Sequence, residues 1–257
     1  MSKTKILCLH GAQLSADARG VLIELMRHIA DFSSRSSGCN LVRGIPSTLF
    51  GSHPATDLPR APYTYRLEKE ENCTFHFVNG PLPTASHESV ASFYDGQCYR
   101  YFHWAPSPTP FALSQVADAC AFLRRVIEDE GPFDGVVGFS QGAVMALALA
   151  LEHEEQRPEA PPPFRFAVLF SCPYLPYPGG DRDNAEWGAT AVPSLHVAGR
   201  NDDEWFEASR TVLHENCVDG TASLVVHDGG HAVPKDRETV ERVGREISKF
   251  VRENRGS

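Results

Sequence analysis

Short apolar runs alternate with helix-like amphipathic stretches along most of this 257-residue chain. The runs are rich in Val, Leu and Phe and are bounded by Gly, Pro or Asp, as buried strands are: Lys5–Leu9, Phe75–Val78, Gly135–Val137, Phe166–Phe170, Ser194–Ala198 and Ser223–Val226. Helical spacing of apolar residues between the runs predicts helices around residues 21–29, 116–127 and 240–251. This alternation predicts an α/β fold with a mainly parallel, doubly wound sheet and helices on both faces. Sheets of this kind place their active sites at the carboxyl ends of the strands.

The composition argues against several classes of protein. The formal net charge is −9 and no basic run exceeds two residues, whereas a nucleic-acid-binding surface needs clustered Lys and Arg. The longest apolar run, Ala143–Leu151, has half the length of a membrane span. The N-terminal residues lack the apolar core of a signal peptide, and the seven cysteines include no Cys-x-x-Cys pair. We therefore expect a cytoplasmic protein with reduced thiols, no metal or other cofactor, and neither a nucleic acid nor a membrane as its partner.

We expect residues 1–257 to form one domain that contains two unusual segments. Residues 33–71 carry four prolines and no clear periodicity, which predicts either a disordered surface excursion or a functional lid. Residues 93–111 hold seven aromatic side chains with interleaved prolines, which predicts a rigid loop that is neither strand nor helix. Such a loop suits the wall of an apolar substrate channel, although a hydrophobic cluster beneath a long loop has the same composition.

The pentapeptide Gly138-Phe-Ser140-Gln-Gly142 is the strongest chemical signal. It follows the apolar run that begins at Gly135 and precedes the helix-like stretch that begins at Ala143. Glycines two residues before and after the serine permit a sharp strand-to-helix turn that lifts the hydroxyl off the sheet. The positive end of the following helix favours negative charge beside that hydroxyl. The pattern predicts that Ser140 is a nucleophile.

A serine nucleophile needs a base and a carboxylate, and the candidates follow later strands. His231 lies on a glycine-flanked loop after the last predicted strand, whereas His227 ends that strand and is expected to point into packing or solvent. Asp202 lies three residues after Gly199 and is preferred to its neighbour Asp203. The order Ser, Asp, His is that of the α/β-hydrolase fold.

Backbone amides are the expected donors to an oxyanion. One is the N–H of Gln141, directly after the nucleophile, and the other is the N–H of Ala12 in the turn after the first predicted strand. His10 can brace that turn, or it can be a structural histidine. The candidates for substrate contact are four aromatic residues, two from the segment 93–111 and two that follow the predicted acid: Phe102, Trp104, Trp205 and Phe206. The histidines, cysteines and glycines show no spacing typical of a metal, phosphate or dinucleotide site.

Five blocks in order resemble the FSH family of serine hydrolases: Leu7–Gly11, Phe75–Pro81, Phe133–Gly142, Leu195–Gly199 and Gly229–His231. Members of this family include fungal enzymes similar to the thioesterase that releases the lovastatin polyketide. The resemblance implies an α/β-hydrolase fold and the triad Ser140, Asp202 and His231. Residues 33–71 are longer than the resemblance implies.

The leading hypothesis is a serine thioesterase that releases a polyketide or a similar acyl chain from an acyl carrier protein through an acyl-enzyme. One alternative is a general carboxylesterase that acts on small oxygen esters, because both reactions use the same triad. Another is a hydrolase-fold binding protein without activity.

Overall fold

The computed structural model describes residues 3–13, 67, 71–86, 96–104, 110–175, 188–234 and 236–255. The predicted helix around residues 21–29 and nearly all of the segment 33–71 lie outside the described residues. None of the helices within these ranges is long and apolar enough to cross a membrane.

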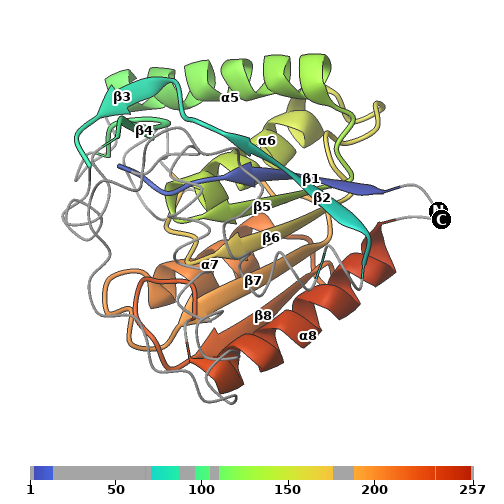
Figure 1. Ribbon diagram of the computed structural model, residues 1–257. Helices are drawn as coiled ribbons and strands as arrows, with labels where there is room; N and C mark the ends of the chain where they lie inside the picture. The colour runs from blue at the N-terminus through green and yellow to red at the C-terminus, as the bar shows by residue number, and fades with distance from the viewer. Residues whose placement is uncertain are drawn as a thin grey trace.

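A six-stranded sheet forms the centre of the molecule, with its strands in the order β2-β1-β5-β6-β7-β8 (Figure 1). Every adjacent pair is parallel. The strands are β1 (Thr4–Leu9), β2 (Cys73–Val78), β5 (Gly135–Phe139), β6 (Phe166–Phe170), β7 (Ser194–Gly199) and β8 (Ala222–His227). Each contains one of the six predicted apolar runs, so the predicted parallel sheet is confirmed.

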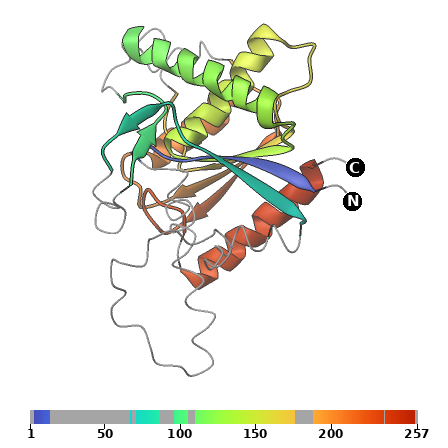
Figure 2. The ribbon, with the colours of Figure 1, turned by 45° about the horizontal axis from the view of Figure 1, so that its top comes forward.

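Helices cover both faces of this sheet, as the rotated view shows (Figure 2). Helices α5 (Pro110–Glu130) and α6 (Gln141–Gln156) pack on one face against alternate strand residues such as Leu7, Leu9 and Val136. Helix α8 (Arg237–Asn254) packs on the other face against the intervening residues, such as Ile6 and Val137. Strands buried on both sides need apolar residues at successive positions, which is why the runs are continuous rather than alternating.

The two predicted helical faces that the structure describes are buried. On α8, the four residues are Val240, Val243, Ile247 and Val251, each at most 5% exposed, and Asp236 caps the helix by accepting the Thr239 N–H at 2.8 Å. On α5, Val116, Cys120 and Leu123 of the predicted face are buried, whereas Ile127 is only partly buried. Helix α7 (Phe206–Asn216), which follows β7, was not predicted.

A second, two-stranded sheet overturns the prediction of an irregular loop at residues 93–111. Strand β4 (Cys98–Arg100) pairs antiparallel with β3 (Leu82–Thr84), and α5 already begins at Pro110. Proline is compatible with the first turn of a helix, so the prolines mark the helix start as well as the loop. Of the seven aromatic residues, only Tyr99 lies within β4, and Tyr101 follows directly after the strand.

The end of the segment 33–71 is anchored to the C-terminal helix. The Glu71 carboxylate is 1% exposed and pairs with Arg252 and, at 3.5 Å, with Arg255. Arg255 also donates to the Glu71 carbonyl at 2.8 Å. These contacts fix the chain as it enters β2.

Candidate active site

The turn between β5 and α6 holds Ser140 in strained backbone geometry. Its φ of 52° and ψ of −118° are unusual for a residue with a side chain, and such strain occurs where the surrounding structure enforces it. The Ser140 N–H donates to the carbonyl of Phe170 on β6 at 2.9 Å, and the Ser140 carbonyl accepts from Ala143 and Val144 in the first turn of α6. The hydroxyl therefore stands at the carboxyl end of β5, at the N-terminus of α6.

The two glycines of the pentapeptide are required by close backbone contacts. A Cβ on Gly138 would lie 2.5 Å from the Gly142 carbonyl oxygen, and a Cβ on Gly142 would lie 2.2 Å from the Leu9 carbonyl oxygen. Both neighbours are backbone atoms, which cannot move aside cheaply. The second contact brings the N-terminus of α6 against the end of β1, where the turn with Ala12 begins.

Ser140, His231 and Asp202 form a continuous chain of hydrogen bonds. His231 Nε2 lies 2.9 Å from Ser140 Oγ, and His231 Nδ1 lies 2.7 Å from Asp202 Oδ2. A carboxylate can only accept, so Nδ1 carries the proton and Nε2 is free to accept from the hydroxyl. Residues separated by 91 and 29 positions in the chain thus meet above the carboxyl ends of β5, β7 and β8.

The structure also distinguishes the two candidate carboxylates. Asp202 is 5% exposed, and its Oδ1 accepts the Trp205 N–H at 3.3 Å while Oδ2 faces His231. Asp203 is exposed. The structure brings the preferred Asp202, and not Asp203, to the imidazole.

His10 braces the turn that follows β1, which is one of the two roles predicted for this histidine. Its Nε2 accepts the Gly80 N–H at 2.9 Å, and its Nδ1 donates to the Gly11 carbonyl at 2.6 Å. Burial lowers the pKa of His10 to about 4, so the ring is neutral and can make both contacts at once. The turn that carries Ala12 is therefore tied to the chain that follows β2.

The side chain of Gln141 is a structural element that sequence reasoning missed. Its Oε1 accepts the Tyr101 N–H at 2.7 Å and its Nε2 donates to the Phe102 carbonyl at 2.8 Å. Both ends of the side-chain amide are thus bound, while its backbone N–H, the first of α6, has no intrahelical acceptor. A glutamine after the nucleophile is the only sequence signal for this clamp, and nothing local shows where its partner lies.

The four aromatic candidates for substrate contact have different environments. Phe102 is 1% exposed and packs against Trp104 at 5.7 Å between ring centroids, and its assignment as a substrate contact stays a prediction. Trp104 is 42% exposed and meets Trp205 edge-to-face at 5.1 Å, whereas Phe206 is half-buried at the start of α7. Trp104 and Trp205 therefore form an aromatic pair beside the Asp202 loop.

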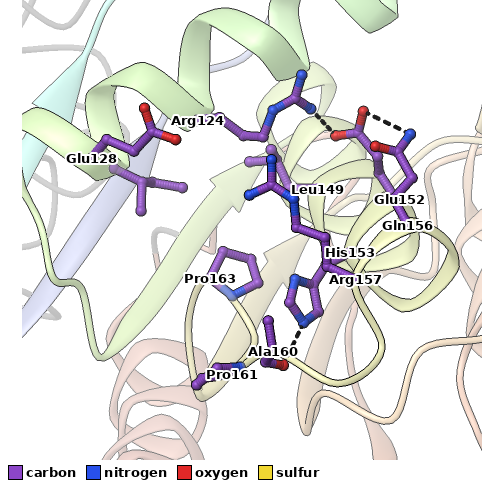
Figure 3. A pocket seen from close by; sticks show the side chains of 11 residues that line it. Arg124, Glu128, Leu149, Glu152, His153, Gln156, Arg157, Ala160, Pro161 and Pro163 are labelled. Atoms are coloured by element: carbon purple, nitrogen blue, oxygen red, sulfur yellow. Dashed lines mark hydrogen bonds and ion pairs between the residues drawn. The ribbon is translucent and has the colours of Figure 1, made fainter.

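A pocket of about 170 Å³ lies elsewhere, between α5, the second half of α6 and the proline-rich chain that follows it (Figure 3). Its lining includes Leu149, Glu152 and Gln156, which lie roughly 14–24 Å along the helix from Ser140 at 1.5 Å per residue. This pocket is not part of the triad site. Within the described ranges, no group of three or more His, Cys, Asp or Glu could hold a metal ion.

Comparison with known proteins assigns the family. A sequence model described as serine hydrolase (FSH1) matches residues 63–243. The chain belongs to the FSH1 family of serine hydrolases. Esterase FPY3 of Fusarium mangiferae is 31% identical over 201 residues, which cover 73% of this chain and 86% of that protein. Hydrolase phiM of a fungal species is 26% identical over 204 residues, which cover 76% of this chain and 89% of that protein. The chain is accordingly an ester-cleaving hydrolase.

Solved structures bear out the predicted α/β-hydrolase fold. Arabidopsis thaliana SOBER1 superposes with a TM-score of 0.55 and 16% identity, covering 98% of this chain and 99% of SOBER1. A carboxylesterase from Mesorhizobium loti superposes with a TM-score of 0.54 and 18% identity, covering 96% and 90%. At these identities the likeness concerns the fold alone.

Proposed function

We propose that this serine hydrolase cleaves acyl thioesters with large apolar acyl groups and releases the acyl chain from a carrier protein. The observation that carries the catalytic part is the hydrogen-bonded series Ser140, His231 and Asp202. The preference for a large acyl group is supported by the aromatic pair of exposed Trp104 and half-buried Trp205 beside the triad.

In the first half-reaction, His231 Nε2 takes the proton from Ser140 as Oγ attacks the thioester carbonyl carbon. The backbone N–H groups of Gln141 and Ala12 stabilise the negative charge on the carbonyl oxygen, and each such donor is worth about 3–4 kcal/mol. His231 then returns the proton to the leaving sulfur as the C–S bond breaks. The products are a free thiol and an ester on Ser140.

In the second half-reaction, water attacks this ester and gives a proton to His231. The tetrahedral adduct collapses when His231 protonates Ser140 Oγ, which releases the carboxylic acid and restores the free enzyme. Asp202 acts in both halves by holding the Nδ1 proton and stabilising the imidazolium that forms each time.

In this proposal, Trp104 and Trp205 hold the apolar part of the substrate. Trp205 lies three residues after Asp202, and Trp104 lies two residues after Phe102, whose carbonyl is bound by Gln141. Both segments are thus fixed to the triad loops, and their edge-to-face contact joins them. An acyl chain that packs on the exposed face of Trp104 would bury apolar area at about 25 cal/mol per Å².

Hydrolysis of small oxygen esters is the second candidate, favoured by the names of the fungal relatives, which include esterases FPY3 and FUS5. The triad serves either reaction, because both pass through the same tetrahedral geometry. The acyl group and the leaving atom therefore have to be varied separately.

A matched substrate panel tests the proposal. Acetyl and decanoyl groups are each presented as a pantetheine thioester, as a p-nitrophenyl oxyester and on an acyl carrier protein. We expect kcat/KM to be at least about 10-fold higher for the decanoyl thioester than for acetyl substrates, and higher again on the carrier. We expect Trp104→Ala to reduce that chain-length ratio mainly through KM, because it removes apolar area and not a reacting group.

Two controls accompany the panel. Ser140→Ala must abolish turnover and labelling by a fluorophosphonate probe. If kcat/KM for the acetyl oxyester equalled that for the decanoyl thioester, the small-ester esterase would be favoured. If kcat/KM for the carrier-bound substrate did not exceed that for the pantetheine thioester, the carrier protein would be removed from the proposal.

A further inference from the structure

The loop that carries His231 is held against the loop that carries Asp202 by backbone contacts. The Arg200 N–H donates to the His227 carbonyl at 2.7 Å, and the Asn201 N–H donates to the Gly229 carbonyl at 3.0 Å. Asn201 Nδ2 also donates to the Asp228 carbonyl at 2.6 Å. Backbone hydrogen bonds thus join the loops after β7 and β8 as far as Asn201, one residue before Asp202, and Gly229, two residues before His231.

The His227 side chain contacts the backbone of the loop that carries His231. It is the last residue of β8, it is 3% exposed, and its Nδ1 accepts the Gly229 N–H at 3.0 Å. A Cβ at Gly229 would lie 2.8 Å from that Nδ1, so the ring and the loop backbone are in close contact. The sequence prediction that His227 points into packing or solvent is confirmed for packing, but the side chain also makes this specific contact.

The contact requires one protonation state. The Gly229 N–H can only donate, so Nδ1 has no proton and the ring is neutral with its proton on Nε2. We propose that His227 is a positioning residue whose neutral ring holds the Gly229 backbone, and through it keeps His231 within reach of Ser140. This inference rests on the serine hydrolase activity of the site and not on the identity of its acyl substrate.

The charged groups around His227 come from three elements. Arg242 lies on α8 and Asp236 caps that helix, while Asp228 and Asp202 lie on the two loops. Burial lowers the pKa of His227 and Arg242 lowers it further, against the opposing effect of the three carboxylates. The ring is therefore neutral at neutral pH, and it gains a proton only on the acid side of the ordinary histidine range.

Protonation of His227 would place two N–H groups face to face. The Nδ1–H of the imidazolium would oppose the Gly229 N–H, and a hydrogen bond would become a repulsive contact. Acidification below the lowered pKa of His227 would then loosen the loop that carries the base. The acid side of the pH–rate profile should therefore fall more steeply in the wild type than in a variant whose residue 227 does not titrate.

Replacement by asparagine and by leucine separates this role from simple packing. Asparagine can place Oδ1 where Nδ1 now lies and it does not titrate, whereas leucine fills the space without an acceptor. With p-nitrophenyl acetate at pH 8, we expect His227→Asn to keep kcat within about threefold of the wild type. We expect His227→Leu to lose about 10- to 100-fold in kcat with little change in KM, because the base is displaced while the substrate site remains.

The pH profile supplies a readout that a packing defect would not change. At a pH below the lowered pKa of His227, the slope of log kcat/KM against pH should approach two in the wild type and one in His227→Asn. The control His214→Asn removes an exposed histidine on α7 and should keep the wild-type slope. Circular dichroism and thermal unfolding establish that each variant is folded at each pH.

Three results would overturn the inference: full activity in folded His227→Leu, a folded His227→Asn as inactive as the leucine variant, or equal slopes in wild type and His227→Asn. Failure of the proposed function is seen separately, since it would appear in the wild type and in Ser140→Ala.

Discussion

Replacement of Asp202 by asparagine tests the hydrogen-bonded series directly. Oδ1 accepts the Trp205 N–H at 3.3 Å and Oδ2 accepts from His231 Nδ1 at 2.7 Å. An asparagine has one oxygen for these two donors. The Trp205 N–H also donates to the Asp202 backbone carbonyl at 3.3 Å, and it can only donate, so an amide NH₂ facing it would be repelled. The imidazole can change its tautomer, so the amide NH₂ is expected to face the ring. His231 would then accept at Nδ1 and carry its proton on Nε2, where it cannot accept the Ser140 proton.

The size of the effect follows from this wrong tautomer. The equivalent change in a serine protease lowers kcat by about 10⁴-fold with the geometry intact. Here the His231 side chain is 31% exposed, so water can support a fraction of the productive tautomer. We expect a fall of about 10³- to 10⁴-fold, which corresponds to about 4–5 kcal/mol in the activation free energy at 1.36 kcal/mol per factor of ten.

The neighbouring residue provides a matched control. Asp203→Asn makes the same change in charge one position away, at an exposed side chain, and should leave kcat within about twofold. Both variants are assayed with p-nitrophenyl acetate at pH 8, with the thermal midpoint measured alongside. The reasoning would be refuted if folded Asp202→Asn kept more than a tenth of wild-type kcat, or if both variants lost activity equally.

Two further predictions concern stability. His196 is 1% exposed, and burial lowers its pKa to about 4, so the unfolded chain binds more protons than the folded chain between pH 6.5 and 4. The free energy of unfolding should therefore fall by about 3 kcal/mol as the pH falls through that window. Urea unfolding of His196→Leu should show a weaker pH dependence, and an unchanged pH dependence would contradict this role of His196. A Cβ on Gly199 would lie 2.3 Å from the carbonyl oxygens of Gly229 and Gly230, so Gly199→Ala should cost about 3 kcal/mol and most of the activity. Gly230→Ala, whose Cβ would meet nothing closer than 3.4 Å, should cost much less, and similar thermal midpoints for the two variants would argue against this contact.

Local patterns carried most of the fold prediction. Apolar runs in β1, β5 and β6 are continuous because both faces of the sheet are buried. Each of these strands can therefore be recognised from its own few residues. The short pair β3 and β4 was missed, since three-residue strands have too few positions to show a period. Helix α7 was missed as well, and its mixture of charged and apolar residues is only moderately amphipathic.

The candidate site was predictable where chemistry depends on sequence neighbours. Ser140 could be identified because its flanking glycines are required by close backbone contacts, those of Gly138 within the same turn and those of Gly142 with the end of β1. His231 and Asp202 could be proposed because each follows a strand, and parallel strands end at the same edge of the sheet. The environment of Phe102 could not be predicted, because it depends on a clamp from Gln141, 39 positions away in the chain.

Sequence alone determined which strands form the central sheet, near which residues each of them ends and which side chains follow those ends, because strand burial and turn chemistry are properties of a few adjacent residues. Tertiary structure decided which of those side chains meet. Strand order and register set the distance from His231 to Ser140, choose Asp202 over Asp203, and turn His227 inward onto the backbone of Gly229. Contacts of this kind join segments whose separation along the chain carries no information about their separation in space.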